Sequence, residues 1–234
     1  MKRHTIFFAF LLVAVTGLSQ TPASVEITAE PHHHLLLENP YVRVFRAEVA
    51  PGDATLMHRH GHDYVFVSIG ASDVLNQVEG KPAVTLKLKD GETRFAAGPF
   101  SHIARNQATT PFVAIAVELL QDQAAHTTPP PKWDEERGLH VLSGGTRDIM
   151  FVQDGVRVSE IELQAGAVVP SHHHNGPHLV VAVTDVDLRS DIEGKAPMPV
   201  HMKAGDAKWV LGGYTHTVTN TGKQEARFVT LEFQ

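Results

Sequence analysis

The feature that most constrains the fold of this chain is an internal repeat with a constant offset of 114 residues. Val42-Arg43-Val44 recurs as Val156-Arg157-Val158, and Glu79-Gly80-Lys81 recurs as Glu193-Gly194-Lys195. Single residues keep the same register: Glu48 and Glu162, Gly52 and Gly166, His58 and His172, His60 and His174, Gly91 and Gly205, His102 and His216, Asn106 and Asn220, and Glu118 and Glu232. A repeat of this length predicts two copies of one domain of about 85 to 100 residues.

Each copy has the sequence pattern of β-structure. Val42 and Val44 alternate with Arg43, and the ranges 65–69 and 84–89 show the same two-residue period. Turn pairs such as Asp90-Gly91 and Gly212-Gly213 interrupt the chain at short intervals, and no helical periodicity follows the first 22 residues. We therefore expect an all-β protein, with a small antiparallel sandwich or barrel in each copy.

The first 22 residues have the pattern of a secretory signal peptide. Lys2 and Arg3 precede an apolar run of 14 residues, Thr5 to Leu18, which small and polar residues follow. This run is shorter than the roughly 20 residues of a membrane-spanning helix, although an uncleaved N-terminal anchor is the alternative. We expect a periplasmic or secreted protein without a stable membrane anchor. The predicted division is 1–22 signal peptide, 30–120 first domain, 121–138 Pro-rich linker and 139–234 second domain.

Composition narrows the chemistry that the chain can perform. The 234 residues include 16 His and no Cys, so any metal must bind through histidine or carboxylate, and disulfides and thiol nucleophiles are excluded. The formal net charge is −6, and no basic run is present. Because nucleic-acid affinity depends on cationic side chains that neutralise phosphates, a nucleic-acid partner is not expected.

Nine of the histidines fall in four short segments, namely His58, His60 and His62; His102; His172, His173, His174 and His178; and His216. Two histidines separated by one residue on a strand point to the same face, so both rings can approach one ion. A third histidine follows each pair by more than 40 residues. Strands paired side by side can bring it to the same place.

These spacings resemble the cupin family. Its first motif, Gly, five residues and His-x-His, matches Gly52 to His60 and Gly166 to His174. Its second motif, with Gly, a turn, His and then Asn after three further residues, matches Gly91 to Asn106 and Gly205 to Asn220. The likeness covers about residues 30 to 234 and implies a bicupin, two tandem jelly-roll β-barrels.

The chain also departs from the family pattern. Tyr64 and His178 stand where the motif has Glu, and Ala97 and Leu211 stand where it has Pro. The resemblance then implies metal ligands that differ between the copies. They are His172, His174, His178 and His216 in the second, which we expect to be the better site, and His58, His60 and His102 in the first, with Tyr64, His62 or Asp63 nearby.

Several of these residues have a second interpretation. His178 could be a core or rim histidine, since Gly176-Pro177 can bend the chain, and Tyr64 could be a packed aromatic. The run His32-His33-His34, which aligns with Thr146, Arg147 and Asp148, is expected to be the polar start of a strand, with accessory metal capture as the alternative. Arg43 and Arg157 are either surface charges or members of a structural ion pair with a residue such as Glu48 or Glu162.

Imidazole ligands with an open coordination position suit Fe, Ni, Cu, Mn or Zn. Without a carboxylate ligand, such a site favours an anionic substrate, and the resemblance points to cupin dioxygenases. We expect a secreted metal-dependent oxidoreductase, dioxygenase-like, acting on a small phenolic or enolic molecule. The alternatives are a non-catalytic bicupin that binds metal or a small ligand, and a metal-dependent sugar isomerase. Exposed sheet edges are compatible with a homodimer.

Overall fold

The structure, a computed structural model, describes residues 23–120, 137–153 and 155–233. This part of the chain is almost entirely β-strand, with one 3-10 turn, η1 (Ile27–Ala29), so the predicted all-β class is confirmed. The predicted signal peptide and most of the predicted linker lie outside the described residues, and β11 begins at Gly138. Over the described ranges, no helix is long and apolar enough to cross a membrane.

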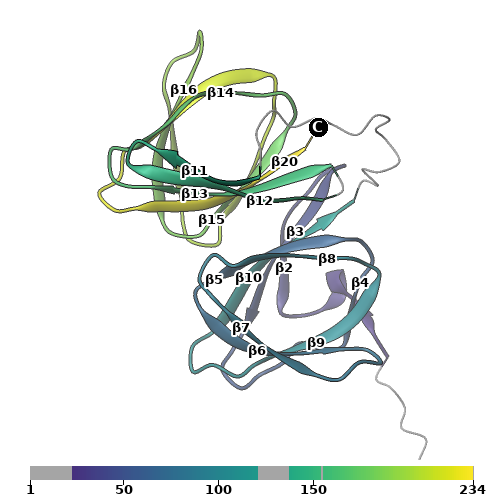
Figure 1. The fold of residues 1–234 in the computed structure, drawn as a ribbon. Helices are drawn as coiled ribbons and strands as arrows, with labels where there is room; N and C mark the ends of the chain where they lie inside the picture. The colour runs from purple at the N-terminus through teal and green to yellow at the C-terminus, as the bar shows by residue number, and fades with distance from the viewer. Residues whose placement is uncertain (1–22, 121–136, 154, 234) are drawn as a thin grey trace, which may run out of the picture.

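The first half consists of two five-stranded sheets that form a barrel-like structure (Figure 1). Sheet A has the order β1 (Val25–Glu26), β4 (His58–His60), β9 (Phe100–Asn106), β6 (Ser72–Val78) and β7 (Val84–Leu88). Sheet B has the order β2 (His33–Glu38), β3 (Val42–Val49), β10 (Phe112–Leu119), β5 (Tyr64–Ile69) and β8 (Thr93–Ala96).

The second half repeats this arrangement. Sheet C has the order β11 (Gly138–Leu142), β12 (Gly145–Gln153), β13 (Val156–Leu163), β20 (Ala226–Phe233), β15 (His178–Ala182) and β18 (Ala207–Val210). Sheet D has the order β14 (Val168–His174), β19 (Tyr214–Asn220), β16 (Val186–Ile192) and β17 (Met198–Met202). Six strands, β3 and β6 to β10, have the same bounds as β13 and β16 to β20 after addition of 114 residues.

The two halves share one hydrophobic core between sheets B and C. Along β10, Val113, Ile115 and Val117 lie on one face of sheet B, while Ala114 and Ala116 on the other face line the cavity of the first half. Ile115 and Val117 join Val229 and Leu231 of β20 in a single buried cluster. Both faces of β10 are therefore apolar, because one faces its own barrel and the other faces the second half.

Two equivalent turn glycines lie where the halves meet. Gly91 has a φ of +77°, a conformation that favours glycine, and a Cβ built on it would be 2.6 Å from the guanidinium of Arg227. Arg227 donates to the carboxylate of Asp90 at 2.7 Å. Gly205, the repeat partner of Gly91, lies against Arg46 of the first half in the same way. The contact between the two halves thus contains the same glycine position from both copies of the repeat.

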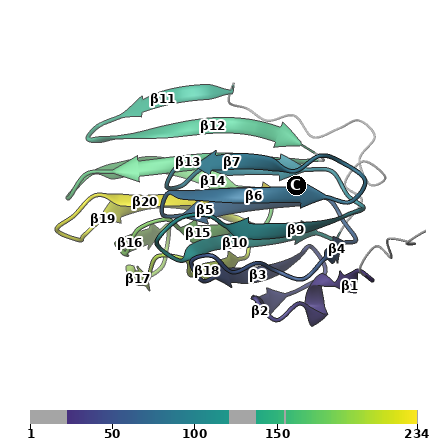
Figure 2. The ribbon, with the colours of Figure 1, turned by 90° about the horizontal axis from the view of Figure 1, so that it is seen from below.

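The copies differ in the segment that precedes their common strands. In the first half β1 pairs in parallel with β4, so the chain passes beside the strand that carries His58 before it enters β2. In the second half β11 instead forms a hairpin with β12. In the view of Figure 2 these two segments lie at opposite edges of the molecule.

Candidate metal centres

The first centre consists of His58, His60 and His102. Strand β4 pairs antiparallel with β9, and this register places His58 opposite His102. His58 and His60 are buried and Arg59 between them is exposed, as the two-residue period predicts. One ligand atom from each histidine lies within 4.8 Å of the others.

The second centre consists of His172, His174 and His216. His172 lies opposite His216 in the pairing of β14 with β19. The Nε2 atoms of His172 and His174 are 3.1 Å apart, those of His174 and His216 are 3.1 Å apart, and those of His216 and His172 are 3.0 Å apart. Three nitrogens bound at about 2.1 Å to one ion, at about right angles, would be about 3.0 Å apart, so this spacing fits a metal.

Outer hydrogen bonds in the second centre fix which nitrogen of two rings carries its proton. The Nδ1 of His172 lies 2.8 Å from the carbonyl of Pro170, and the Nδ1 of His174 lies 3.0 Å from the carboxylate of Glu232. Both partners only accept, so each Nδ1 must donate, which leaves the Nε2 of each ring as the atom that can face a metal. The Nδ1 of His216 lies 2.7 Å from the hydroxyl of Ser190, which can accept in the same way.

The outer partners are repeated in the first centre at the same offset. The Nδ1 of His58 lies 3.0 Å from the carbonyl of Leu56, which corresponds to Pro170. The Nδ1 of His102 lies 2.6 Å from the amide oxygen of Asn76, which corresponds to Ser190. The duplication therefore extends beyond the histidines to the groups that orient them, as a metal site requires.

Lone pairs that converge at this spacing repel one another unless a cation lies between them. The Nε2 of His58 is buried without a hydrogen-bond partner among the described residues. Burial also lowers the pKa of His58 to about 4 and the pKa values of His60 and His216 to about 3. Imidazoles that burial keeps neutral are the donors that a divalent transition metal prefers, so both groups fit such an ion.

A buried glutamate accompanies each centre on the last strand of its half. Glu232 accepts from Arg157 at 2.7 Å and 2.8 Å, and Glu118 accepts from Arg43 at 3.3 Å. Each arginine lies directly opposite its glutamate in the strand pairing. Arg43 and Arg157 therefore form ion pairs, as predicted, but the predicted partners were wrong. Glu48 pairs with Arg46 instead, and Glu162 pairs with Arg227.

The two glutamates differ in their contact with the second histidine of each His-x-His pair. The carboxylate of Glu232 accepts a hydrogen bond from His174. Burial alone raises the pKa of Glu232, but His174 and two arginines lower it to about 2. Glu118 lies 3.8 Å from the Nδ1 of His60, and burial raises its pKa. The second centre is therefore the more tightly supported of the two.

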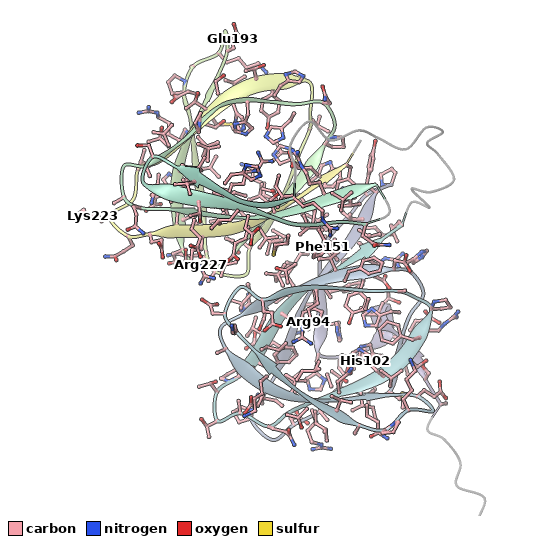
Figure 3. The ribbon with its side chains drawn as sticks, viewed as in Figure 1. Arg94, His102, Phe151, Glu193, Lys223 and Arg227 are labelled. Carbon is pink, nitrogen blue, oxygen red and sulfur yellow. The ribbon has the colours of Figure 1, made fainter. Side chains whose placement is uncertain are left out.

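Each centre opens into a cavity of its own barrel, of about 440 Å³ in the first half and about 550 Å³ in the second. The walls are mainly apolar and aromatic, with Phe95 and Phe100 in the first and Trp209 and Tyr214 at the equivalent positions of the second. Cationic side chains also line them: Lys81 and Arg94 in the first, and Lys195, Lys208 and Arg147 in the second. Arg94 and His102 both lie within the outline of the first barrel in Figure 3.

The structure brings six of the seven predicted ligands together and leaves out His178. The ring of His178 stacks on that of His174 with centroids 4.0 Å apart, and His178 is outside the three-histidine group. Tyr64 stacks on His60 in the same manner at 4.2 Å. His62 is exposed, and Asp63 accepts from the amide of Gly98. Positions 64 and 178 thus pack against a ligand ring.

One pair of residues beside the first centre was not predicted as part of it. His33 lines the first cavity, and its Nδ1 donates to the buried carboxylate of Glu30 at 2.6 Å. The histidine run was interpreted as the polar start of a strand, and β2 does begin at His33. The spacing Glu30-x-x-His33 was the available signal, but nothing in the sequence placed it near His58.

Glu30 should make the protein less stable in acid. Burial alone raises its pKa, but hydrogen bonds from His33, His32 and the amide of Leu56 lower it to about 2, from 4.5. Between pH 4.5 and 2 the unfolded chain therefore binds more protons than the folded protein does. As the pH is lowered through this window, the free energy of unfolding falls by up to about 3 kcal/mol. Denaturant titrations should show a flatter pH dependence in Glu30→Gln, and an unchanged slope would contradict this assignment.

Comparison with known proteins supports the architecture. No family model matches the chain, and no curated protein sequence matches it. A single-residue variant of oxalate decarboxylase from Bacillus subtilis superimposes with a TM-score of 0.60 at 14% identity, over 83% of this chain and 69% of that one. AerE from Microcystis aeruginosa gives 0.60 at 10% identity, over 88% and 98%. A cupin 2 conserved barrel domain protein from Leptotrichia buccalis gives 0.52 at 10% identity, over 86% and 88%.

Mn(II) centres are described for the Bacillus subtilis oxalate decarboxylase. That structure superimposes on this chain with a TM-score of 0.60 at 12% identity, over 88% of this chain and 75% of that one. At identities of 10 to 14%, these likenesses concern the fold.

Proposed function

From the tandem cupin fold that this chain has, as its sequence predicted, we propose that it is a metal-dependent enzyme with one centre in each barrel. His58, His60 and His102 would hold one divalent transition metal, and His172, His174 and His216 a second. Fe, Ni, Cu, Mn and Zn all suit imidazole ligands to some degree. The observation that carries the proposal is the convergence of three Nε2 atoms, fixed from behind by acceptors, at the wall of a ligand-sized cavity.

We further propose a dioxygenase-like oxidation of a small phenolic or enolic substrate, with O₂ as the co-reactant. A metal held by three neutral imidazoles would supply a Lewis-acidic centre with open positions and uncompensated positive charge. An enolate or phenolate would be attracted to it, and the cationic side chains Arg94 and Lys208 line the same cavities. The aromatic walls would pack against the ring or chain of such a molecule and keep water away.

Oxygen uptake tests this proposal. Protein purified without chelator and loaded in turn with Fe(II), Ni(II), Cu(II) and Mn(II) is expected to consume O₂ with at least one member of a panel of flavonols, catechols and diketones. Protein boiled after loading is the control for chemistry of the free metal. Metal binding without oxygen uptake across the whole panel would instead support a non-catalytic bicupin that binds metal or a small ligand.

Glu232 gives a prediction for metal affinity. Replacement by Gln removes the charged acceptor behind His174, and loss of such an outer partner weakens metal binding by about 10–100-fold. Glu118→Gln is the matched control at the equivalent position, and we expect a smaller effect there because Glu118 lies 3.8 Å from His60. Competition with a chromophoric chelator gives both affinities, and equal losses in the two variants would contradict the difference between the centres.

Residues 1–22 lead us to propose export to the periplasm or the outside of the cell. Their charged start and 14-residue apolar run carry this proposal. Expression of the full sequence followed by N-terminal sequencing of the protein from each cell fraction tests it. A full-length N-terminus confined to the cytoplasm would overturn it.

A further inference from the structure

His33 lies beside the first centre without belonging to it. Its ring centroid is 4.7 Å from that of His58 and 6.4 Å from that of His60, and its side chain lines the cavity. His33 is not among the three histidines whose ligand atoms lie within 4.8 Å of one another. It is therefore a neighbour of the ligands on the cavity wall, where a molecule bound at the metal could contact it.

Glu30 holds this imidazole in one orientation. The Glu30 side chain is fully buried and accepts from the Nδ1 of His33 at 2.6 Å, the Nδ1 of His32 at 3.0 Å and the backbone amides of His32 and Leu56 at 2.9 Å and 3.1 Å. These contacts fix the carboxylate, so the Nδ1 of His33 carries a proton. When the ring is neutral, the Nε2 of His33, at the other side of the ring, has a lone pair, and this side chain lines the cavity.

The second half lacks this pair. At the same offset, Gly144 replaces Glu30 and Arg147 replaces His33. The positions are equivalent in the sheets as well, because His33 pairs with Ala47 and Arg147 pairs with Ile161, which is 114 residues from Ala47. Both side chains line their cavities. The two barrels therefore present an acceptor in one case and a guanidinium donor in the other.

We propose that His33 is a positioning residue that accepts a hydrogen bond from a hydroxyl group of a ligand bound at the first centre. The ligand class is a phenol, catechol or enol that reaches the metal through one oxygen and keeps a second hydroxyl within reach of His33. The guanidinium of Arg147 only donates hydrogen bonds, so we expect the preference for a ligand hydroxyl group in the first barrel and not in the second. The inference rests on the proposed function, since it requires a metal on His58, His60 and His102.

Binding of 4-nitrocatechol to the full chain loaded with Zn(II) tests this role, because Zn(II) has no redox chemistry and turnover does not interfere. Absorbance titration is expected to resolve two binding steps in the wild type. In His33→Asn, the shorter amide can still donate to Glu30 but places nothing at the Nε2 position, so one step should weaken about tenfold, as for loss of one hydrogen bond, while the other is unchanged.

His33→Gln places an amide oxygen near the Nε2 position and should restore most of this affinity. His34→Asn is the matched control, because His34 is the exposed neighbour on the same strand. All variants should retain the wild-type zinc content. Wild-type probe binding together with an unchanged His33→Asn would overturn this inference alone. Zinc loss in His33→Asn would make His33 a ligand and overturn it too, and absence of probe binding in the wild type would overturn it together with the proposed function.

Discussion

His172→Ala is expected to lower the metal content of the chain from about two ions to about one. The Nε2 of His172 lies 3.1 Å and 3.0 Å from those of His174 and His216, so its removal leaves two ligands where three converge. The first centre lies in the other barrel and shares no ligand with the second, so it should keep its ion. Elemental mass spectrometry of protein purified without chelator measures the number of metal ions per chain in the wild type and in the variant.

His173→Ala is the control for this experiment. His173 is exposed between the two ligands of β14 and contacts Thr215 instead of the cavity, so its replacement should leave two ions bound. His58→Ala should reproduce the loss of one ion from the other half. If His172→Ala retains two ions, or loses both, the assignment of one independent ion to each barrel is wrong.

Leu231→Ala should cause a large loss of stability. Leu231 is 0% exposed in the core between sheets B and C, and it pairs with Val158 on one neighbouring strand and Leu179 on the other. Truncation removes its apolar contacts and leaves a cavity that both halves border, which costs about 2–5 kcal/mol. A shift of the urea midpoint at unchanged slope measures this loss.

Leu139→Ala is the same chemical change at an exposed site. Leu139 is 63% exposed on the edge strand β11, so its truncation should change the free energy of unfolding by no more than about 0.5 kcal/mol. If the two variants unfold at similar urea concentrations, the space between the sheets is not a shared core.

The repeat predicted most of the fold because strand positions follow from sequence period and turn residues. Strands β9 and β19 occupy equivalent ranges, and each carries the distant histidine and the following Asn. The Asn side chains, Asn106 and Asn220, donate to backbone carbonyls at 2.8 Å to 3.0 Å, as expected of Asn at the end of a strand. The local sequence pattern was sufficient to predict these contacts, because each Asn and the backbone carbonyls that accept from it occur at equivalent positions in both copies.

The sequence was least informative where a side chain meets a residue far away in sequence. His178 has the motif spacing of a ligand, but β15 begins at His178 in a different sheet from β14, which carries His172 and His174. Its ring therefore stacks behind His174. Arg43 forms its ion pair with Glu118 and not with Glu48, because the pairing of β3 with β10 places Arg43 directly opposite Glu118.

The sequence by itself determined the two copies, their strands and the six histidines that converge, because a period of two and a repeat of 114 residues are properties of the chain alone. Only the tertiary structure decided which groups surround those histidines. Glu118 and Glu232 reach them from the other sheet of the same half, and Glu30 and His33 reach the first centre because β1 passes beside β4. Such contacts depend on register and chain path, which are fixed when the sheets pack against each other and have no local signal.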